Sequence, residues 1–137
     1  MKYFIGNWKM FGVPRSINIL NKINSFISRD KNRNKYRVII TPPYTLLQSF
    51  VKQLDNKKIM IGSQNCYQKD QFSSNTAAVS SYMIKSVGAK YTLVGHSDNR
   101  GEGDTDSMLK DKVRYAIKNN LKVVFCIGEN RIEKKNK

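Results

Sequence analysis

The alternation of short apolar runs with longer amphipathic stretches constrains the fold more than any other feature. Five runs have the length and the β-branched or aromatic content of buried strands: residues 3–9, 37–41, 58–65, 91–97 and 121–129. Helical patterns separate them, and the connections are short. Strand–helix alternation of this kind is typical of a parallel sheet covered by helices. The sequence therefore predicts an α/β protein, although periodicity alone does not separate a doubly wound sheet from a barrel.

The helices are predicted from apolar spacing and from their end signals. Pro14 opens the first, residues 45–54 form the second, residues 77–88 form the third with Gly88 as its C-terminal cap, and Asp104 or Thr105 begins the fourth. The apolar positions expected on one side of the fourth helix are Met108, Leu109, Val113, Ala116 and Ile117. A further helical stretch is expected to begin in the charged residues at the end of the chain.

Composition excludes several classes of protein. The 137 residues are 39% hydrophobic and 26% charged, which suits a globular domain. No apolar run approaches the roughly 20 residues of a membrane-spanning helix. The N-terminal residues are too polar for a signal peptide, so a cytoplasmic protein is expected. The two cysteines, Cys66 and Cys126, have no metal-ligand spacing and are expected to be buried, reduced thiols; no metal or cofactor is expected.

The net charge of +15 raises the alternative of a basic nucleic-acid-binding protein. The basic residues are, however, spread along the chain and concentrate only in residues 31–37 and in the C-terminal tail. They lack the interleaved aromatic residues that single-strand binders use for stacking. Nucleic acid is therefore an unlikely partner, and a solvated basic surface or an anionic substrate explains the charge.

Polar side chains end three of the predicted strands. Asn7 and Lys9 end the first, Gln64 and Asn65 end the third, and His96, the only histidine, ends the fourth. Asn7 and Lys9 are two residues apart, so in a strand both face the same side, while Trp8 and Met10 face the opposite side and are expected in the core. In parallel α/β proteins the carboxyl ends of the strands face the ligand site. These polar residues are thus candidates for a site.

Six short segments, in this order along the chain, resemble the triosephosphate isomerase family: GNWKM (6–10), SQNCY (63–67), GAKY (88–91), VGHSDNR (94–100), GDTD (103–106) and VVFCIGE (123–129). The family's fold is a (β/α)8 barrel, usually of about 250 residues. The resemblance implies that residues 1–137 are the N-terminal portion of one TIM-barrel domain that lacks strands six to eight. It also implies isomerisation of a phosphorylated triose in glycolysis and gluconeogenesis.

The resemblance also implies a role for each strand-end residue. By this resemblance His96 is the neutral imidazole that polarises the substrate carbonyl. Lys9 supplies fixed positive charge, and Asn7 hydrogen-bonds the substrate oxygens. Asp98 stands where the family has a glutamate that contacts the lysine; it is one methylene shorter, so its reach to Lys9 is an open question.

Two departures from the family pattern bear on assembly and activity. In the third loop, residues 75–80 keep Thr76 but lose the family's glycine and acid; this loop makes the family's homodimer contact. The family's general base follows strand six, beyond Lys137. The chain alone is therefore expected to be inactive as an isomerase. A half-barrel that binds phosphorylated ligands without catalysis stays open as an alternative.

Overall fold

The computed structural model describes residues 1–54 and 58–128, and within them five strands form one parallel sheet. The strands are β1 (Lys2–Asn7), β2 (Tyr36–Thr41), β3 (Ile59–Ser63), β4 (Tyr91–Val94) and β5 (Lys122–Phe125), and they lie in the sheet in chain order. Each pairs in parallel with the next. Parallel pairing in simple chain order, with a helix between strands, is the arrangement of a (β/α) barrel. The predicted α/β fold is confirmed as its N-terminal half.

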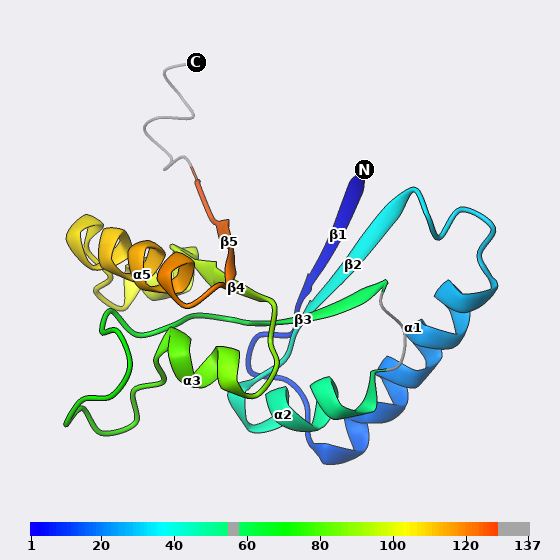
Figure 1. The fold of residues 1–137 in the computed structure, drawn as a ribbon, viewed down its shortest axis with the longest axis horizontal. Coiled ribbons are helices and arrows are strands. Elements are labelled where there is room, and N and C mark those ends of the chain that lie inside the picture. Colours follow the sequence, from blue (N-terminus) through cyan, green and yellow to red (C-terminus); the bar gives the residue numbers. More distant parts are fainter. Residues whose placement is uncertain (55–57, 129–137) are drawn as a thin grey trace.

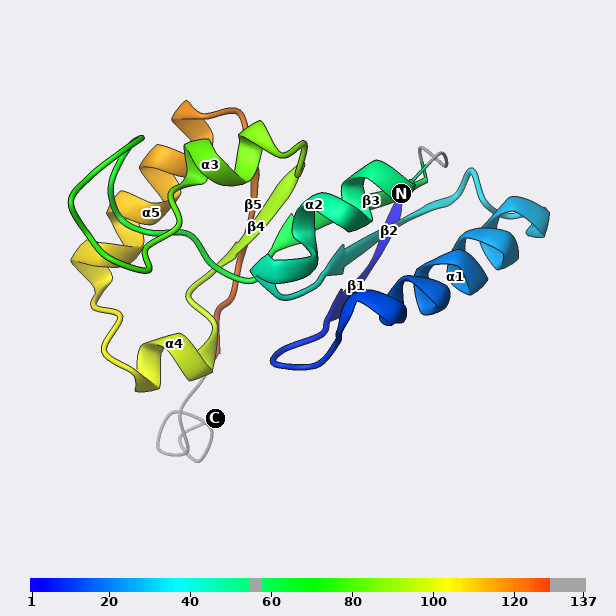
Figure 2. The ribbon, with the colours of Figure 1, turned by 90° about the horizontal axis from the view of Figure 1, so that it is seen from below.

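Helices connect the strands on one side of the sheet (Figure 1). They are α1 (Ile17–Arg29), α2 (Tyr44–Gln53), α3 (Ser81–Ser86), α4 (Ser97–Gly101) and α5 (Asp106–Lys118), and the 3-10 turn η1 (Pro14–Ser16) precedes α1. Seen from below, α1 and α2 accompany β1 to β3, and α3 and α5 accompany β4 and β5 (Figure 2). Among the described elements, no helix covers the opposite, concave side of the sheet (Figure 1).

The third helix begins later than predicted. It was expected from residue 77, but α3 begins at Ser81, after Ser80, whose hydroxyl accepts a hydrogen bond from the backbone N–H of Met83. Ala77 has a φ of +65°, a left-handed conformation that a helix cannot contain. Thr105 caps α5 in the same manner as Ser80, which confirms the predicted start of that helix.

The hydrophobic core lies between the sheet and its helices. Its buried members include Leu20, Ile27, Leu46, Phe50, Ile61, Ile84 and Leu109. Gly88 is required where α3 turns into β4, because its φ is +95° and a Cβ there would lie 2.6 Å from Cγ1 of Val51. Two predicted core positions are wrong. Ile117 is 62% exposed, because it faces outward beside the buried Ala116, and Met10 is 95% exposed in the loop after β1.

The concave side of the sheet carries apolar surface. Tyr3, Phe4 and Ile5 of β1 are all exposed, although successive strand residues face opposite sides. Among the described residues β1 pairs only with β2, and β5 only with β4. Both outer strands are therefore open edges.

The described helices include none that is long and apolar enough to cross a membrane. The helical stretch expected at the end of the chain falls on residues 129–137 and lies outside the described residues.

Candidate active site

A cavity of about 500 Å³ opens at the carboxyl ends of the strands. It is lined by Asn7, Lys9, Met10, Phe11, Tyr44, Gln64, Asn65, His96, Asp98, Asn99 and Glu102. All strand-end residues singled out in the sequence thus lie around one space, although they come from three separate segments. The parallel topology causes this convergence, because it places the carboxyl ends of β1, β3 and β4 at the same rim.

Lys9 reaches the cavity through a turn and not through the strand. β1 ends at Asn7, and Lys9 has a φ of +50°, so the predicted strand over residues 3–9 is two residues too long. The Asn7 side-chain oxygen accepts a hydrogen bond from the Lys9 backbone N–H at 2.9 Å. The amide nitrogen of Gln64 donates to the carbonyl oxygens of Lys9 at 2.8 Å and of Thr41 at 2.9 Å. These bonds hold the unfavourable left-handed backbone and aim Lys9 at the site.

Trp8 packs against the core beside this turn, as predicted. Its ring lies edge-on to the buried ring of Phe50, with 5.1 Å between the ring centroids. This contact anchors the segment between Asn7 and Lys9 to α2, so the turn has a rigid base.

His96 is the N-terminal cap of α4, and its environment selects one protonation state. Its Nδ1 accepts a hydrogen bond from the backbone N–H of Asp98 at 3.1 Å. A ring nitrogen that accepts from an amide carries no proton, so the imidazole is neutral with its hydrogen on Nε2. The Asp98 carboxylate also lies 3.6 Å from Nδ1, but that distance is too long for a hydrogen bond, and the amide contact decides the state.

Asp98 reaches Lys9, despite being shorter than the glutamate of the resembled family. Lys9 Nζ lies 3.2 Å from Asp98 Oδ2, and both side chains are 55% exposed. A pair this exposed contributes roughly 0–1 kcal/mol to stability. Its effect is therefore on the position of the lysine ammonium and not on the stability of the fold.

The turn that carries His96 is held by Arg100. The Arg100 Nε donates to the carbonyl oxygen of Gly95 at 2.8 Å, and its guanidinium lies 5.7 Å from the ring centroid of Phe125 in β5. Gly95 has a φ of +79°, where other residues are strained. The end of β4 is thus tied to β5 just below His96.

A buried cation supports the other wall of the cavity, and the sequence reading missed it. Lys112 of α5 is 3% exposed; its ammonium contacts both carboxylate oxygens of Asp104 at 2.6 and 2.7 Å and donates to the side-chain oxygen of Asn65 at 3.1 Å. The available signal was its spacing, since Lys112 lies between Leu109 and Ala116 on the apolar face of the helix.

The cysteines differ in their surroundings. Cys66, next to Asn65, is buried as expected, and burial raises the pKa of its thiol to about 11. Cys126 is only partly buried, which corrects the expectation for that residue, and desolvation raises the pKa of its thiol less strongly. Within residues 1–54 and 58–128, no three His, Cys, Asp or Glu side chains are grouped so that they could hold a metal ion.

Comparisons with known proteins agree on one family. The sequence model of the triosephosphate isomerase family matches residues 2–137. The chain is 39% identical over 126 residues to a Bacteroides fragilis protein named triosephosphate isomerase, which covers 90% of this chain and 49% of that protein. It is 35% identical over 133 residues to the protein of that name from Wolbachia pipientis, which covers 96% of this chain and 51% of that protein.

The solved structure of triosephosphate isomerase from Bartonella henselae superposes on this fold with a TM-score of 0.89 at 32% identity. The superposition covers 98% of this chain and 55% of that one. The chain therefore spans about half the length of the relatives that it matches. These matches do not favour the nucleic-acid alternative that the charge had raised. With six ordered motifs, a half-barrel and a family match over nearly every residue, this chain belongs to the triosephosphate isomerase family.

Proposed function

We propose that this chain supplies one half of an active site that interconverts dihydroxyacetone phosphate and glyceraldehyde 3-phosphate. The observation that carries the proposal is the convergence of Asn7, Lys9 and His96 on one cavity. An amide, a cation and a neutral imidazole are the groups that stabilise negative charge developing on the oxygens of an enediolate. The cavity volume of about 500 Å³ is in the usual range for small-molecule sites.

In this proposal each residue has a distinct role. His96, neutral and protonated on Nε2, donates a hydrogen bond to the substrate carbonyl oxygen and passes a proton between the two oxygens. Lys9 provides positive charge to the enediolate and to the phosphate, and Asp98 keeps its ammonium at the rim of the site. Asn7 holds the Lys9 turn through its side-chain oxygen and offers its amide N–H groups to the substrate.

The carbon-bound proton must be removed by a base that this half does not provide. By resemblance, that base is a glutamate after strand six, a part of the barrel that the matched relatives have and this chain does not span. The proposed activity therefore belongs to the whole barrel, with strands β1 to β5 contributing the electrophilic side.

A chimaera tests the proposal. Residues 1–128 of this chain are joined to the C-terminal half of the Bartonella henselae relative, and isomerisation is measured with a coupled dehydrogenase. We expect the parent chimaera to isomerise the substrate. The His96→Gln and Lys9→Met variants should each have a kcat/KM about 100-fold or more below that of the parent chimaera, because each removes a preorganised electrostatic group. Lys110→Met, an exposed lysine of α5, is the matched control and should leave kcat/KM unchanged. Equal turnover in the His96→Gln chimaera would contradict the assigned role.

We propose further that the whole protein is a homodimer through the loop around Thr76. Two observations support this: Thr76 is exposed, and Phe72 in the same loop is 76% exposed while its ring packs edge-on to Tyr82 at 5.4 Å. An exposed aromatic pair is a typical contact surface between proteins. Sedimentation of the chimaera and of its Phe72→Ser variant tests it; a monomeric chimaera would refute it. The cytoplasmic location stays a prediction.

A further inference from the structure

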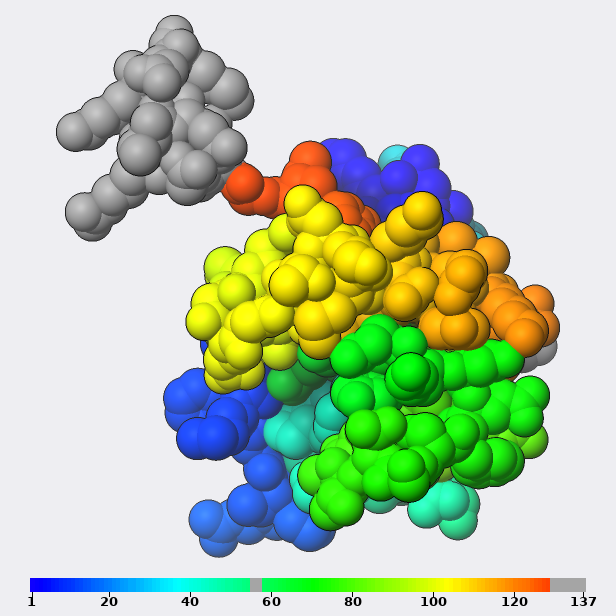
Figure 3. Space-filling model, turned by 90° about the vertical axis from the view of Figure 1, so that its left-hand side faces the viewer, coloured from blue at the N-terminus to red at the C-terminus, as the bar shows by residue number. Residues whose placement is uncertain are grey.

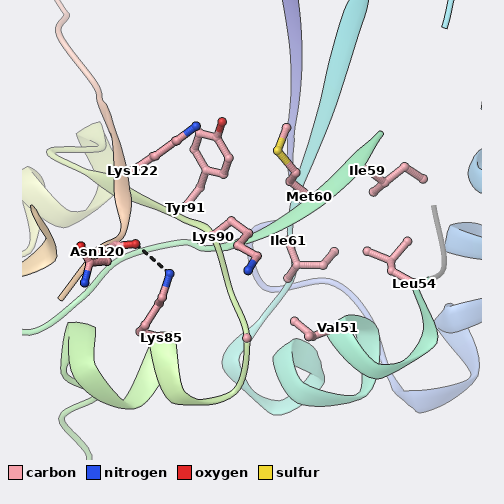
Figure 4. A pocket seen from close by; sticks show the side chains of 11 residues that line it. Val51, Leu54, Ile59, Met60, Ile61, Lys85, Lys90, Tyr91, Asn120 and Lys122 are labelled. Atoms are coloured by element: carbon pink, nitrogen blue, oxygen red, sulfur yellow. Dashed lines mark hydrogen bonds between the residues drawn. The ribbon is translucent and has the colours of Figure 1, made fainter. Parts of the chain in front are cut away.

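A second cavity, of about 580 Å³, lies at the opposite end of the sheet from the candidate active site. It opens among the amino ends of β3, β4 and β5 and the last residues of α2 and α3 (Figure 4). Aliphatic side chains make one wall, with Val51, Leu54, Ile59 and Ile61 on the side of α2 and β3. Lys85 and Lys90 make the other wall, on the side of α3 and the start of β4, while Lys122 lies beside the Tyr91 ring on the other face of the sheet (Figure 4).

The cavity exists because β3 extends past the start of β4. The two strands pair only at Gly62 with Tyr91 and at Ser63 with Thr92, so residues 59–61 have no partner strand on that side. The chain enters β4 through Gly88, where a side chain would collide with Val51, and the backbone N–H of Lys90 donates to the carbonyl oxygen of Ile61 at 2.8 Å. The missing pairing leaves a notch with an apolar floor.

The polar side of the notch is strongly cationic. Lys85 Nζ donates to the carbonyl oxygen of Asn120 at 2.8 Å and retains two further N–H donors. Lys122 takes no part in this side, because its ammonium lies 5.7 Å from the ring centroid of Tyr91 on the other face of the sheet. Among the described residues, the Lys90 ammonium has no hydrogen-bond or ion-pair partner, and no carboxylate lines the cavity. Lys85 and Lys90 bring two positive charges to the apolar surface, so an anion placed beside them gains attraction from both.

We propose that this notch is a binding site for an amphipathic organic anion. The apolar tail lies against Val51, Leu54, Ile59 and Ile61, and a carboxylate or phosphate head group lies beside Lys85 and Lys90. The cavity volume matches the usual range of about 300–1,000 Å³ for small-molecule sites. A neutral ligand of the same length lacks the lysine contacts, and a small anion such as inorganic phosphate lacks the apolar contacts. The site is separate from the proposed isomerase site and does not depend on it.

Methyl NMR of the 137-residue chain, titrated with octanoate, tests the location of the site. We expect shifts at the methyl groups of Val51, Leu54, Ile59 and Ile61, and none at Ile5 on the exposed inner side of β1. Octan-1-ol should bind at least tenfold more weakly, and binding of octanoate should weaken as salt is added, because the attraction is electrostatic. Each additional methylene in the tail should strengthen binding by up to about fourfold. Octyl phosphate, titrated in parallel, distinguishes a phosphate head group from a carboxylate one.

Lysine variants test the chemistry. Lys85→Gln with Lys90→Gln should weaken octanoate binding by about tenfold or more and leave octanol binding unchanged. Lys110→Gln on α5 is the matched control and should behave as the parent. Because these side chains are at the surface, an unchanged methyl spectrum of the free variant shows that it is folded. Equal affinity for acid and alcohol, no effect of the lysine variants, or shifts centred on Ile5 would each overturn the proposal.

Discussion

Replacing Lys112 by methionine should destabilise the protein severely. The ammonium of Lys112 neutralises Asp104, whose side chain is only 9% exposed, and the two carboxylate oxygens lie 2.6 and 2.7 Å from it. Methionine keeps the unbranched, apolar stem but leaves the carboxylate buried without a cation. The Asn65 side-chain oxygen also loses one of its two hydrogen-bond donors and keeps the backbone N–H of Cys66. Removing one partner of a buried ion pair typically costs about 3–5 kcal/mol. Since single domains have about 5–15 kcal/mol of stability in total, the loss should be a large fraction of it.

A matched surface pair provides the control. Lys118 also lies on α5 and pairs with Asp70, but its side chain is 62% exposed, so Lys118→Met should cost about 0–1 kcal/mol. Asp70 belongs to the loop before α3, which lies beside α5 at the surface of the molecule (Figure 3). Urea unfolding followed by circular dichroism measures both variants. The double variant Lys112→Met with Asp104→Leu should recover most of the loss, because no buried charge remains unpaired. Equal costs for Lys112→Met and Lys118→Met would refute the reasoning.

Three further predictions concern titration, thiol reactivity and turnover. The hydrogen bond from the Tyr36 hydroxyl lowers the pKa of Asp30 below 3.8, and the same bond raises the pKa of Tyr36 above 10.0. A carboxyl with a lowered pKa stabilises the fold at pH values above its unfolded pKa, and a phenol with a raised pKa stabilises it at pH values below its unfolded pKa. The difference in unfolding free energy between the parent and Tyr36→Phe should therefore be largest between roughly pH 4 and 10 and should shrink below and above that range. A difference that does not change with pH would contradict this. Iodoacetamide at pH 8 should alkylate Cys126 faster than Cys66 in the folded chain. The reason is that a thiol with a pKa of about 11, as at Cys66, is ionised in only about one molecule in a thousand at this pH. Mass spectrometry of the peptides measures both rates, and faster alkylation of Cys66 would contradict the prediction. The 137-residue chain alone should not isomerise triose phosphates, since its half of the site holds no group assigned as the base; turnover above background in the coupled assay would show that another residue replaces it.

Local patterns were sufficient for the elements of the fold. Continuous β-branched runs predicted β2 and β5 to within a few residues, and Pro14 and Gly88 marked a helix start and a helix end correctly. These signals are reliable because each depends on only a few neighbouring residues. Steric limits on φ decide where Pro and Gly can stand, and a parallel strand that is covered on both faces needs a continuous apolar run. The errors at Met10 and Ile117 arise because burial is not decided by neighbouring residues in the sequence. An apolar side chain is buried only if another element covers it, and the described chain places nothing over these two.

The candidate site likewise depends partly on local sequence motifs and partly on tertiary packing. The sequence by itself determined which groups line it, because short motifs at the carboxyl ends of parallel strands must meet at one rim, and this identified Asn7, Lys9 and His96 in advance. Only the tertiary structure decided that Asp98 reaches Lys9 and that a buried lysine supports the far wall. Both contacts depend on distances of about 3 Å between side-chain atoms of residues that lie far apart in the sequence. Residue types restrict which contacts are possible, but such distances are set by how the helices and strands pack together.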